Sequence, residues 1–175
     1  MLENENIILR AVEPEDLELL FKWEYDRSLW EVSTSIAPFS KYILKKYIEN
    51  SHIDLFEAKQ LRLMIVSKAD NNKTVGAIDF FDFEPYHGRA GVGILVYEKS
   101  DRHRGYASQA LQLIIDYAFN ILSLRQLYCN ITTDNTSSLK LFSNLGFEII
   151  GIKKDWLKTC NAWKDEYLMQ LINRK

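Results

Sequence analysis

The stretch GVGILVYEKSDRHRGYASQAL, residues 91–111, decides the fold because it joins a strand to a helix through one short turn. Residues 90–97 are apolar on both faces, which is typical of a central strand. After Gly105, apolar side chains recur at i, i+3, i+4 and i+7 as far as Leu122, which predicts a long amphipathic helix. The first amides of such a helix have no partner within it, and the helix dipole is positive there. The turn therefore predicts a site for an anion such as a phosphate group.

The residues of the turn suit this use individually. Gly105 can adopt left-handed backbone angles and lets an anion approach the main chain. Arg102 and Arg104 add positive charge, and a guanidinium group can bind two phosphate oxygens at once. Ala107 and Ser108 are small and leave the first helical turn open. The Walker and dinucleotide-binding glycine patterns are absent, however, and a lone glycine between a strand and a helix is often a plain connection.

The remaining elements are predicted from periodicity and turn residues on either side of this stretch. A strand is predicted at residues 7–12 and helices at 14–26 and 38–51, with Ser40 as the N-cap of the second helix. Three strands joined by turns are predicted at residues 60–68, 74–84 and 90–97, and the third is the central strand. After the long helix, a strand is predicted at 126–133, a helix at 134–146, and two strands at 147–152 and 163–172.

The predicted order is β-α-α-β-β-β-α-β-α-β-β within a single domain of residues 1–175. Three strands joined by short turns form an antiparallel meander, whereas the strand–helix–strand unit around Gly105 requires a parallel pair. We therefore expect an α+β fold with one mixed, mostly antiparallel sheet of about seven strands flanked by about four helices.

Composition narrows the classes of function. The 175 residues carry a formal net charge of −2, so no general basic surface recruits nucleic acid. Cys129 and Cys160 are too few for a disulfide framework, and no Cys/His cluster has the spacing of a metal site. The N-terminal segment is acidic, unlike a secretion signal, and no apolar run approaches the ~18 residues that a membrane helix needs. We expect a cytoplasmic protein that acts on a small molecule, with no metal and with neither nucleic acid nor membrane as a partner.

Segments along nearly the whole chain resemble motifs of the GNAT superfamily of acyl-CoA-dependent N-acetyltransferases. Residues 102–107 (RHRGYA) resemble its Arg/Gln-x-x-Gly-x-Gly/Ala motif. The other matching segments follow the order of the branch that holds the ribosomal-protein N-terminal and the spermidine and diamine acetyltransferases, at residues 8–26, 87–96, 134–148 and 161–172. The resemblance therefore implies the GNAT fold and an N-acetyltransferase.

The resemblance also implies acetyl-CoA as a substrate and direct transfer of its acetyl group in a ternary complex. In the family, the strand before the loop separates from its parallel neighbour, and the pantetheine arm lies between them. The residues implied in binding the cofactor are Ile94, Leu95, Val96, Arg102, His103, Arg104, Gly105, Tyr106, Ala107, Ser108, Asn135 and Ser138. The backbone N–H of Val96, or of a neighbour, would polarise the acetyl carbonyl. For Asn135 the alternative is a structural role as a helix N-cap.

Two positions depart from the family pattern. Phe142 stands where relatives commonly have a tyrosine that protonates the leaving thiolate, and Gly91 where many have a glutamate that serves as base. A thiolate with a solution pKa of ~8–9 leaves tolerably without a protein acid, so the chemistry survives the loss of the tyrosine. Tyr106 and Tyr128 are candidates to replace it, and Tyr128 is the catalytic candidate of the two.

The strand DFFDFE, residues 79–84, combines carboxylates with aromatic rings, which bind ammonium groups through charge and cation–π contacts. The candidate acceptor-binding residues are Glu24, Trp30, Asp79, Asp82, Glu84 and Asp165. Asp82 is also a catalytic candidate for handling the proton of the amine. The alternative for the strand is an ordinary solvated face, and for Glu24 surface charge.

Three acceptors or roles are consistent with these residues. The first is a polyamine or diamine such as spermidine, which the acidic and aromatic strand favours. The second is the N-terminal amine of a protein, and the third is a CoA-binding module with little catalysis, which the two departures favour. Because the final strands of this superfamily often pair subunits, we also expect a homodimer or a larger homo-oligomer.

Overall fold

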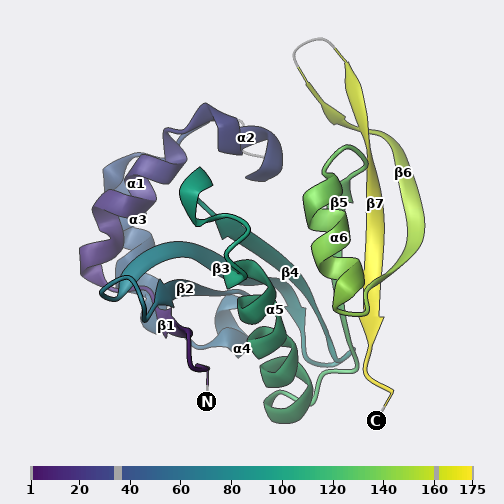
Figure 1. Ribbon diagram of the computed structural model, residues 1–175, viewed down its shortest axis with the longest axis horizontal. Helices are drawn as coiled ribbons and strands as arrows, with labels where there is room; N and C mark the ends of the chain where they lie inside the picture. The colour runs from purple at the N-terminus through teal and green to yellow at the C-terminus, as the bar shows by residue number, and fades with distance from the viewer. Residues whose placement is uncertain (1, 34–36, 160–161, 175) are drawn as a thin grey trace. The chain divides into compact units, whose positions relative to one another are not determined.

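The structure, a computed structural model, describes residues 2–33, 37–159 and 162–174. The chain divides into two compact units, of which one comprises Met1–Arg10 and Leu55–Lys175 and the other Ala11–Asp54 (Figure 1). The larger unit contains nearly all of the sheet and the long helix, and the smaller unit is largely helical.

Seven strands form one sheet in the order β1-β2-β3-β4-β5-β7-β6. The pairs β2–β3, β3–β4, β5–β7 and β6–β7 are antiparallel, and β4–β5 is parallel. The strands are β1 (Ile7–Ala11), β2 (Leu61–Ser67), β3 (Lys73–Glu84), β4 (Arg89–Val96), β5 (Gln126–Thr132), β6 (Glu148–Lys158) and β7 (Trp163–Ile172). The predicted α+β fold with a mixed, mostly antiparallel sheet is confirmed.

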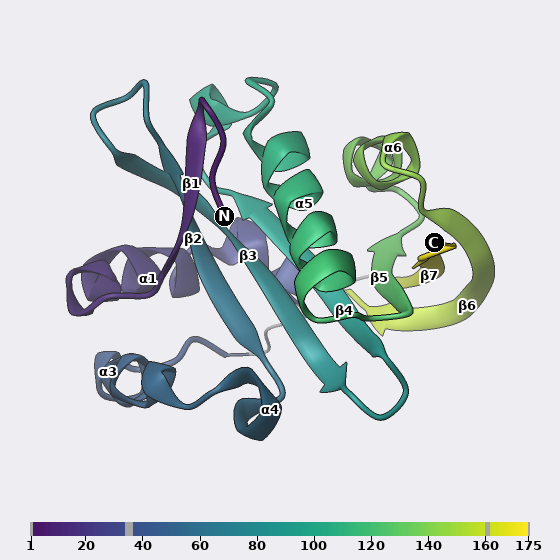
Figure 2. The same cartoon turned by 90° about the horizontal axis from the view of Figure 1, so that it is seen from below.

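The helix α5 (Tyr106–Asp116) lies along one face of β2, β3 and β4 and leads across to β5 (Figure 2). Its apolar face is the one that the periodicity predicts, with Leu111 and Ile114 fully buried. They belong to one core with Phe80 of β3 and Leu127 of β5. Burial of a Leu or Ile side chain contributes about 1.5–3 kcal/mol. This packing therefore fixes where α5 begins relative to the end of β4.

The smaller unit contains α1 (Leu17–Glu24), α2 (Arg27–Ser33) and α3 (Lys41–Glu49). α1 packs against α3. The predicted cap of α3 is confirmed, because the Ser40 hydroxyl accepts a hydrogen bond from the N–H of Ile43 at 3.3 Å.

The described residues form six α-helices where about four were expected, because two of them are too short to show a clear apolar periodicity. These are α2, of seven residues, and α4 (Leu55–Ala58), of four. The predicted helix of residues 134–146 is α6 (Thr136–Asn144). β6 continues beyond its predicted end to Lys158 because it pairs with β7 across an irregular register.

Residues 2–33, 37–159 and 162–174 contain neither a membrane-spanning helix nor a cluster of metal ligands. No helix in these ranges is both long and apolar enough to cross a membrane. The same ranges contain no group of three or more His, Cys, Asp or Glu side chains placed to hold a metal ion.

Candidate functional site

The parallel strands β4 and β5 separate into a fork. They pair only at their starts, from Arg89 with Gln126 to Gly91 with Tyr128. Beyond this vertex β4 and β5 run on without pairing to each other (Figure 1). Along the two open edges, backbone N–H and C=O groups have no partner on the facing strand. Such groups are strong hydrogen-bonding sites, so the fork can hold a narrow polar chain.

The loop between β4 and α5 follows the open end of the fork. Gly105 is the N-cap of α5 with a φ of 82°, and His103 has a φ of 62°, so both residues are left-handed. Within the described residues, the N–H groups of residues 103–108 have no acceptor. Consecutive N–H groups in such a turn, at the positive end of a helix dipole, form an anion-binding nest. The left-handed conformation expected at Gly105 is confirmed.

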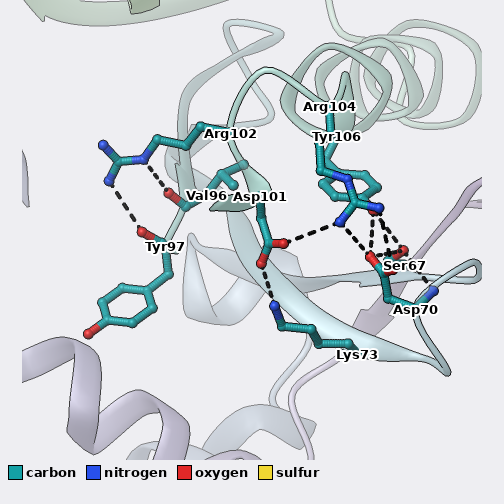
Figure 3. A network of polar contacts seen from close by, with 9 residues as sticks. All are labelled: Ser67, Asp70, Lys73, Val96, Tyr97, Asp101, Arg102, Arg104 and Tyr106. Carbon is teal, nitrogen blue, oxygen red and sulfur yellow. Dashed lines mark hydrogen bonds and ion pairs between the residues drawn. The ribbon is translucent and has the colours of Figure 1, made fainter. Parts of the chain in front are cut away.

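Arg102 ties this loop to the end of β4 (Figure 3). Its Nε and Nη2 donate to the carbonyl oxygens of Val96 and Tyr97, each at 3.2 Å. Its own N–H donates to the carbonyl of Lys99 at 3.2 Å. The nest therefore begins at His103, one residue later than expected, and Arg102 supports it from outside.

Arg104 and Tyr106 are held by the turn between β2 and β3 (Figure 3). Arg104 Nη1 donates to Asp70 Oδ2 at 2.8 Å and to Asp101 Oδ1 at 3.4 Å. The Tyr106 hydroxyl donates to Asp70 Oδ2 at 2.8 Å and shares a 3.0 Å hydrogen bond with Ser67 Oγ. The Arg104 guanidinium, with the Tyr106 hydroxyl, lowers the pKa of the Asp70 carboxyl below its ordinary value.

These contacts correct two expectations about the loop. The Arg104 guanidinium is bound to Asp70 and Asp101, so its side chain supports the loop instead of adding free charge for a phosphate. The Tyr106 hydroxyl is engaged in the core, so it does not replace the missing acid. Asp70 anchors both side chains. Sequence analysis missed it because it lies 34 residues from Arg104, in the turn between β2 and β3.

Tyr128 and Asp82 meet at the vertex of the fork. The Tyr128 hydroxyl donates to Asp82 Oδ2 at 3.0 Å, and its ring packs edge-on against Phe81. Asp82 has a φ of 47° and lies where the register of β3 on β4 shifts, between Phe81 and Glu84. Burial, together with the hydrogen bond to Asp82, raises the pKa of Tyr128 to about 12. Both residues were candidates from the sequence, but only the bulge brings them together.

At both positions that depart from the family pattern, Gly91 and Phe142, aromatic side chains pack in the space. A Cβ on Gly91 would lie 2.2 Å from Cε2 of Phe81, so the ring occupies the space that a side chain would need. Phe142 is buried and packs edge-on against Phe147, with ring centroids 5.0 Å apart. Neither position supplies an acid or a base.

Two of the acidic acceptor candidates are neutralised by ion pairs. Asp79 accepts two hydrogen bonds from Arg62, at 2.7 and 2.9 Å. Asp165 is bound by Lys154 Nζ at 2.7 Å, which lowers the pKa of its carboxyl. Asp82, by contrast, has no cationic partner among the described residues.

Glu84, Glu24 and Trp30 are the remaining acceptor candidates. Glu84 is exposed and in register with Arg89 on β4. Glu24 and Trp30 belong to the smaller unit, where Trp30 Nε1 donates to the Glu24 carbonyl oxygen at 2.8 Å. For Glu24 and Trp30, contact with an acceptor stays a prediction.

Asn135 takes the structural role that was the alternative for it. Its Oδ1 accepts hydrogen bonds from Ser137 Oγ and from the N–H of Ser138, both at 3.2 Å, and so caps α6. Contact of Asn135 or Ser138 with a cofactor stays a prediction. Cys129 is buried, and this burial raises the pKa of its thiol to about 12, so it remains protonated at neutral pH. Cys160 lies outside the described residues.

The sequence is similar to those of known N-acetyltransferases. Residues 6–148 match the family model described as "Acetyltransferase (GNAT) domain". An uncharacterized N-acetyltransferase, p20, from Bacillus licheniformis is 29% identical over 99% of this chain and 97% of its own length. The spermidine N(1)-acetyltransferase of Escherichia coli K12 is 24% identical over 83% of this chain and 75% of its own length.

Solved structures share the fold at lower sequence identity. A crystal structure of spermidine N-acetyltransferase from Vibrio cholerae in complex with CoA and spermine has a TM-score of 0.86 at 19% identity, over 97% of this chain and 96% of that one. A dodecameric structure of spermidine N-acetyltransferase from the same organism has a TM-score of 0.79 at 21% identity, over 97% and 95% of the two chains. These similarities confirm the predicted architecture.

Proposed function

The chain belongs to the GNAT acetyltransferase family, and on that premise we propose that it transfers the acetyl group of acetyl-CoA to a primary amine, with a polyamine or diamine as the first candidate acceptor. The observation that carries this proposal is the fork. The unbonded N–H groups of residues 103–108 follow its open end, and the Tyr128–Asp82 pair lies at its vertex.

The fork suits coenzyme A in chemistry and in length. The N–H groups of residues 103–108 suit its diphosphate. From Gly91 to Val96, β4 covers about 17 Å at ~3.3 Å per residue, which is comparable to an extended pantetheine arm. Ile94 lies between Gly91 and Val96 with its main-chain groups toward the open edge, whereas the carbonyl of Leu95 faces β3. A cofactor bound in this way would place its thioester near the vertex.

In the proposed reaction, the lone pair of a neutral amine attacks the thioester carbonyl carbon. The C–S bond of the tetrahedral intermediate then breaks, and the proton lost by the nitrogen reaches the departing thiolate through solvent. Such a transfer mainly needs positioning and support for the developing oxyanion. Val96, the donor that the family resemblance suggests, lies about 17 Å from the vertex along β4, so a main-chain N–H of β4 nearer the vertex would supply that support. The acetyl group passes directly to the amine, since the protonated, buried thiol of Cys129 is a poor nucleophile.

Tyr128 acts in this proposal as a hydrogen-bond donor. Its pKa of about 12 keeps the hydroxyl protonated at neutral pH. Because a thiol has a pKa of ~8–9, proton transfer from Tyr128 to the thiolate would be uphill by roughly 4–5 kcal/mol. The hydroxyl instead orients the carboxylate of Asp82 through the 3.0 Å hydrogen bond.

A cationic acceptor is supported by the surroundings of the vertex and by the relatives. Asp82 lies beside the rings of Phe81 and Tyr128, and no described residue forms an ion pair with its carboxylate. Alkylammonium groups keep their proton up to pH ~10, so Asp82 would bind the amine as a cation first, and the ammonium would then release one proton to solvent before its nitrogen attacks. Relatives named as spermidine N(1)-acetyltransferases support a polyamine. The dodecameric relative supports a homo-oligomer, and the use of acetyl-CoA supports a cytoplasmic location.

The proposed function is tested by titration with CoA followed by turnover of acetyl-CoA with spermidine, putrescine, lysine and an alanine-start peptide. Saturable CoA binding with turnover of spermidine or putrescine is expected. Turnover of the peptide alone would move the assignment to N-terminal acetylation. Tight CoA binding without turnover of any amine would leave a binding module, and failure to bind CoA would remove the whole proposal.

Asp82→Asn is expected to raise the KM for spermidine about tenfold, a loss of roughly 1.4 kcal/mol of binding, because the amide cannot pair with an ammonium. The KM for acetyl-CoA should stay the same. Steady-state kinetics with each substrate varied in turn provide the measurement.

Asp116→Asn is the matched control for this substitution. Asp116 is an exposed carboxylate on α5 that accepts a hydrogen bond from Gln112 at 3.1 Å, much as Asp82 accepts one from Tyr128. It should leave both KM values unchanged. An unaltered KM for spermidine in Asp82→Asn would exclude Asp82 from the acceptor site.

A further inference from the structure

Lys153 of β6 lies inside a cage of groups that bind cations. Its Nζ donates to Asn130 Oδ1 at 2.7 Å and to Glu166 Oε2 at 2.9 Å. The same Nζ lies over the ring of Trp156, 5.0 Å from the centroid. The side chain of Glu166 is only 8% exposed and that of Lys153 28%. The ammonium is thus partly desolvated, although the Trp156 ring is itself 57% exposed. Among the described ion pairs, Lys73–Asp101 has a similarly buried carboxylate.

The donor set of the cage is that of an ammonium receptor. A nearly buried carboxylate, an amide oxygen and an aromatic face together replace the water around a primary ammonium. A buried carboxylate without a cation would cost several kcal/mol, so the cage needs a positive charge. Lys153 supplies it from the chain itself, and a ligand ammonium of the same chemistry would fit equally well.

The cage lies beside the vertex of the fork on the same face of β5. Leu127, Cys129 and Ile131 are buried in the core, so the alternate residues Tyr128 and Asn130 point to the opposite face. Their Cα atoms are about 6.6 Å apart, at ~3.3 Å per residue. Two cation sites beside these neighbouring side chains would be close enough for a short diamine to approach both.

We infer that the cage of Asn130, Glu166 and Trp156 is a second cation subsite of the acceptor site, filled by the ammonium of Lys153. A diamine whose first nitrogen lies near Asp82 would direct its second nitrogen toward this cage and meet Lys153 there. Lys153 is thus a specificity-determining residue that weakens selection of diamines over monoamines. The role of Lys153 in selectivity rests on the proposed function. Binding of an added ammonium in the cage does not depend on that function.

Lys153→Met empties the cage of charge while keeping an unbranched apolar stem. The variant is expected to unfold at a lower temperature than the native protein, because Glu166 loses its cation. Putrescine at neutral pH should raise its Tm in a saturable way, and by more than it raises the Tm of the native protein. The response should disappear in the double variant Lys153→Met, Glu166→Gln. If Lys153→Met does not fold, Lys153→Gln, whose amide can still donate to Glu166, carries the same measurement.

Lys154→Met is the matched control. Lys154 is the next residue on β6, and its ion pair with Asp165 at 2.7 Å has the same chemistry but an exposed lysine. Its Tm should respond to putrescine no more than the Tm of the native protein does. A missing response in Lys153→Met, or an equal one in Lys154→Met, would overturn the assignment of the cage.

Kinetics test the consequence for selectivity. In Lys153→Met the ratio of kcat/KM for putrescine to that for butylamine should rise about tenfold, and Lys153→Arg should keep the native ratio. A Tm response with an unchanged ratio would refute the role in selectivity. A Tm response in a protein that acetylates no amine would retain the cation cage and reject the proposed function, so the two failures are distinct.

Discussion

Gly105→Asp is expected to weaken binding of coenzyme A by about a hundredfold or more. The new carboxylate would sit among the unbonded N–H groups of residues 103–108, where it would accept their hydrogen bonds and repel the diphosphate. Steric conflict does not dominate, because a Cβ at this position meets only the end of Gln109, at 3.4 Å. Isothermal titration calorimetry with CoA provides the dissociation constant.

Gly105→Asn separates the charge from the backbone strain. Gly105 has a φ of 82°, which strains any side chain, but asparagine tolerates this region better than most residues and has nearly the shape of aspartate. The Asn variant should lose less than about tenfold in affinity. Equal affinity of the Asp and Asn variants, with both folded by circular dichroism, would place the diphosphate elsewhere.

Gly91→Ala is expected to lower the free energy of unfolding by about 3 kcal/mol, at the upper end for overpacking. The added Cβ would lie 2.2 to 2.6 Å from three atoms of the Phe81 ring. That ring also packs edge-on against Tyr128, so it cannot shift without disturbing the vertex of the fork. A glutamate at this position, as many family members have, requires the same displacement. Urea denaturation gives the measurement.

Gly93→Ala is the matched control on the same strand. Gly93 lies two residues along β4, on the same face, and its Cβ would make an ordinary 3.8 Å contact with the same ring. Its cost should stay below about 1 kcal/mol. In a protein that already carries Phe81→Ala, adding Gly91→Ala should cost little further stability, because the ring that the Cβ would meet is absent. Similar losses in Gly91→Ala and Gly93→Ala would contradict the steric account.

At Gly91 the sequence predicted that the family glutamate is absent, but not why it is absent. The absence of a side chain at Gly91 was visible in the sequence, but its cause, the ring of Phe81, depends on how β3 and β4 lie in register. The same holds for Asp82 and Tyr128, which are 46 residues apart and meet only because of the bulge in β3. Side-chain meetings of this kind have no local pattern in the chain.

The sequence by itself predicted the order of the seven strands along the chain, the amphipathic face of α5 and a glycine at residue 105 able to adopt unusual backbone angles. These depend on hydrophobic periodicity and on the conformational range of single residues, which act over short stretches of chain. Only the tertiary structure decided which charges are free. Arg104, Asp79 and Asp165 are all charged in the sequence, yet each is bound by an ion pair, while Asp82 is not. The partner of a charge is chosen by strand register and long-range packing, which no short stretch of sequence contains.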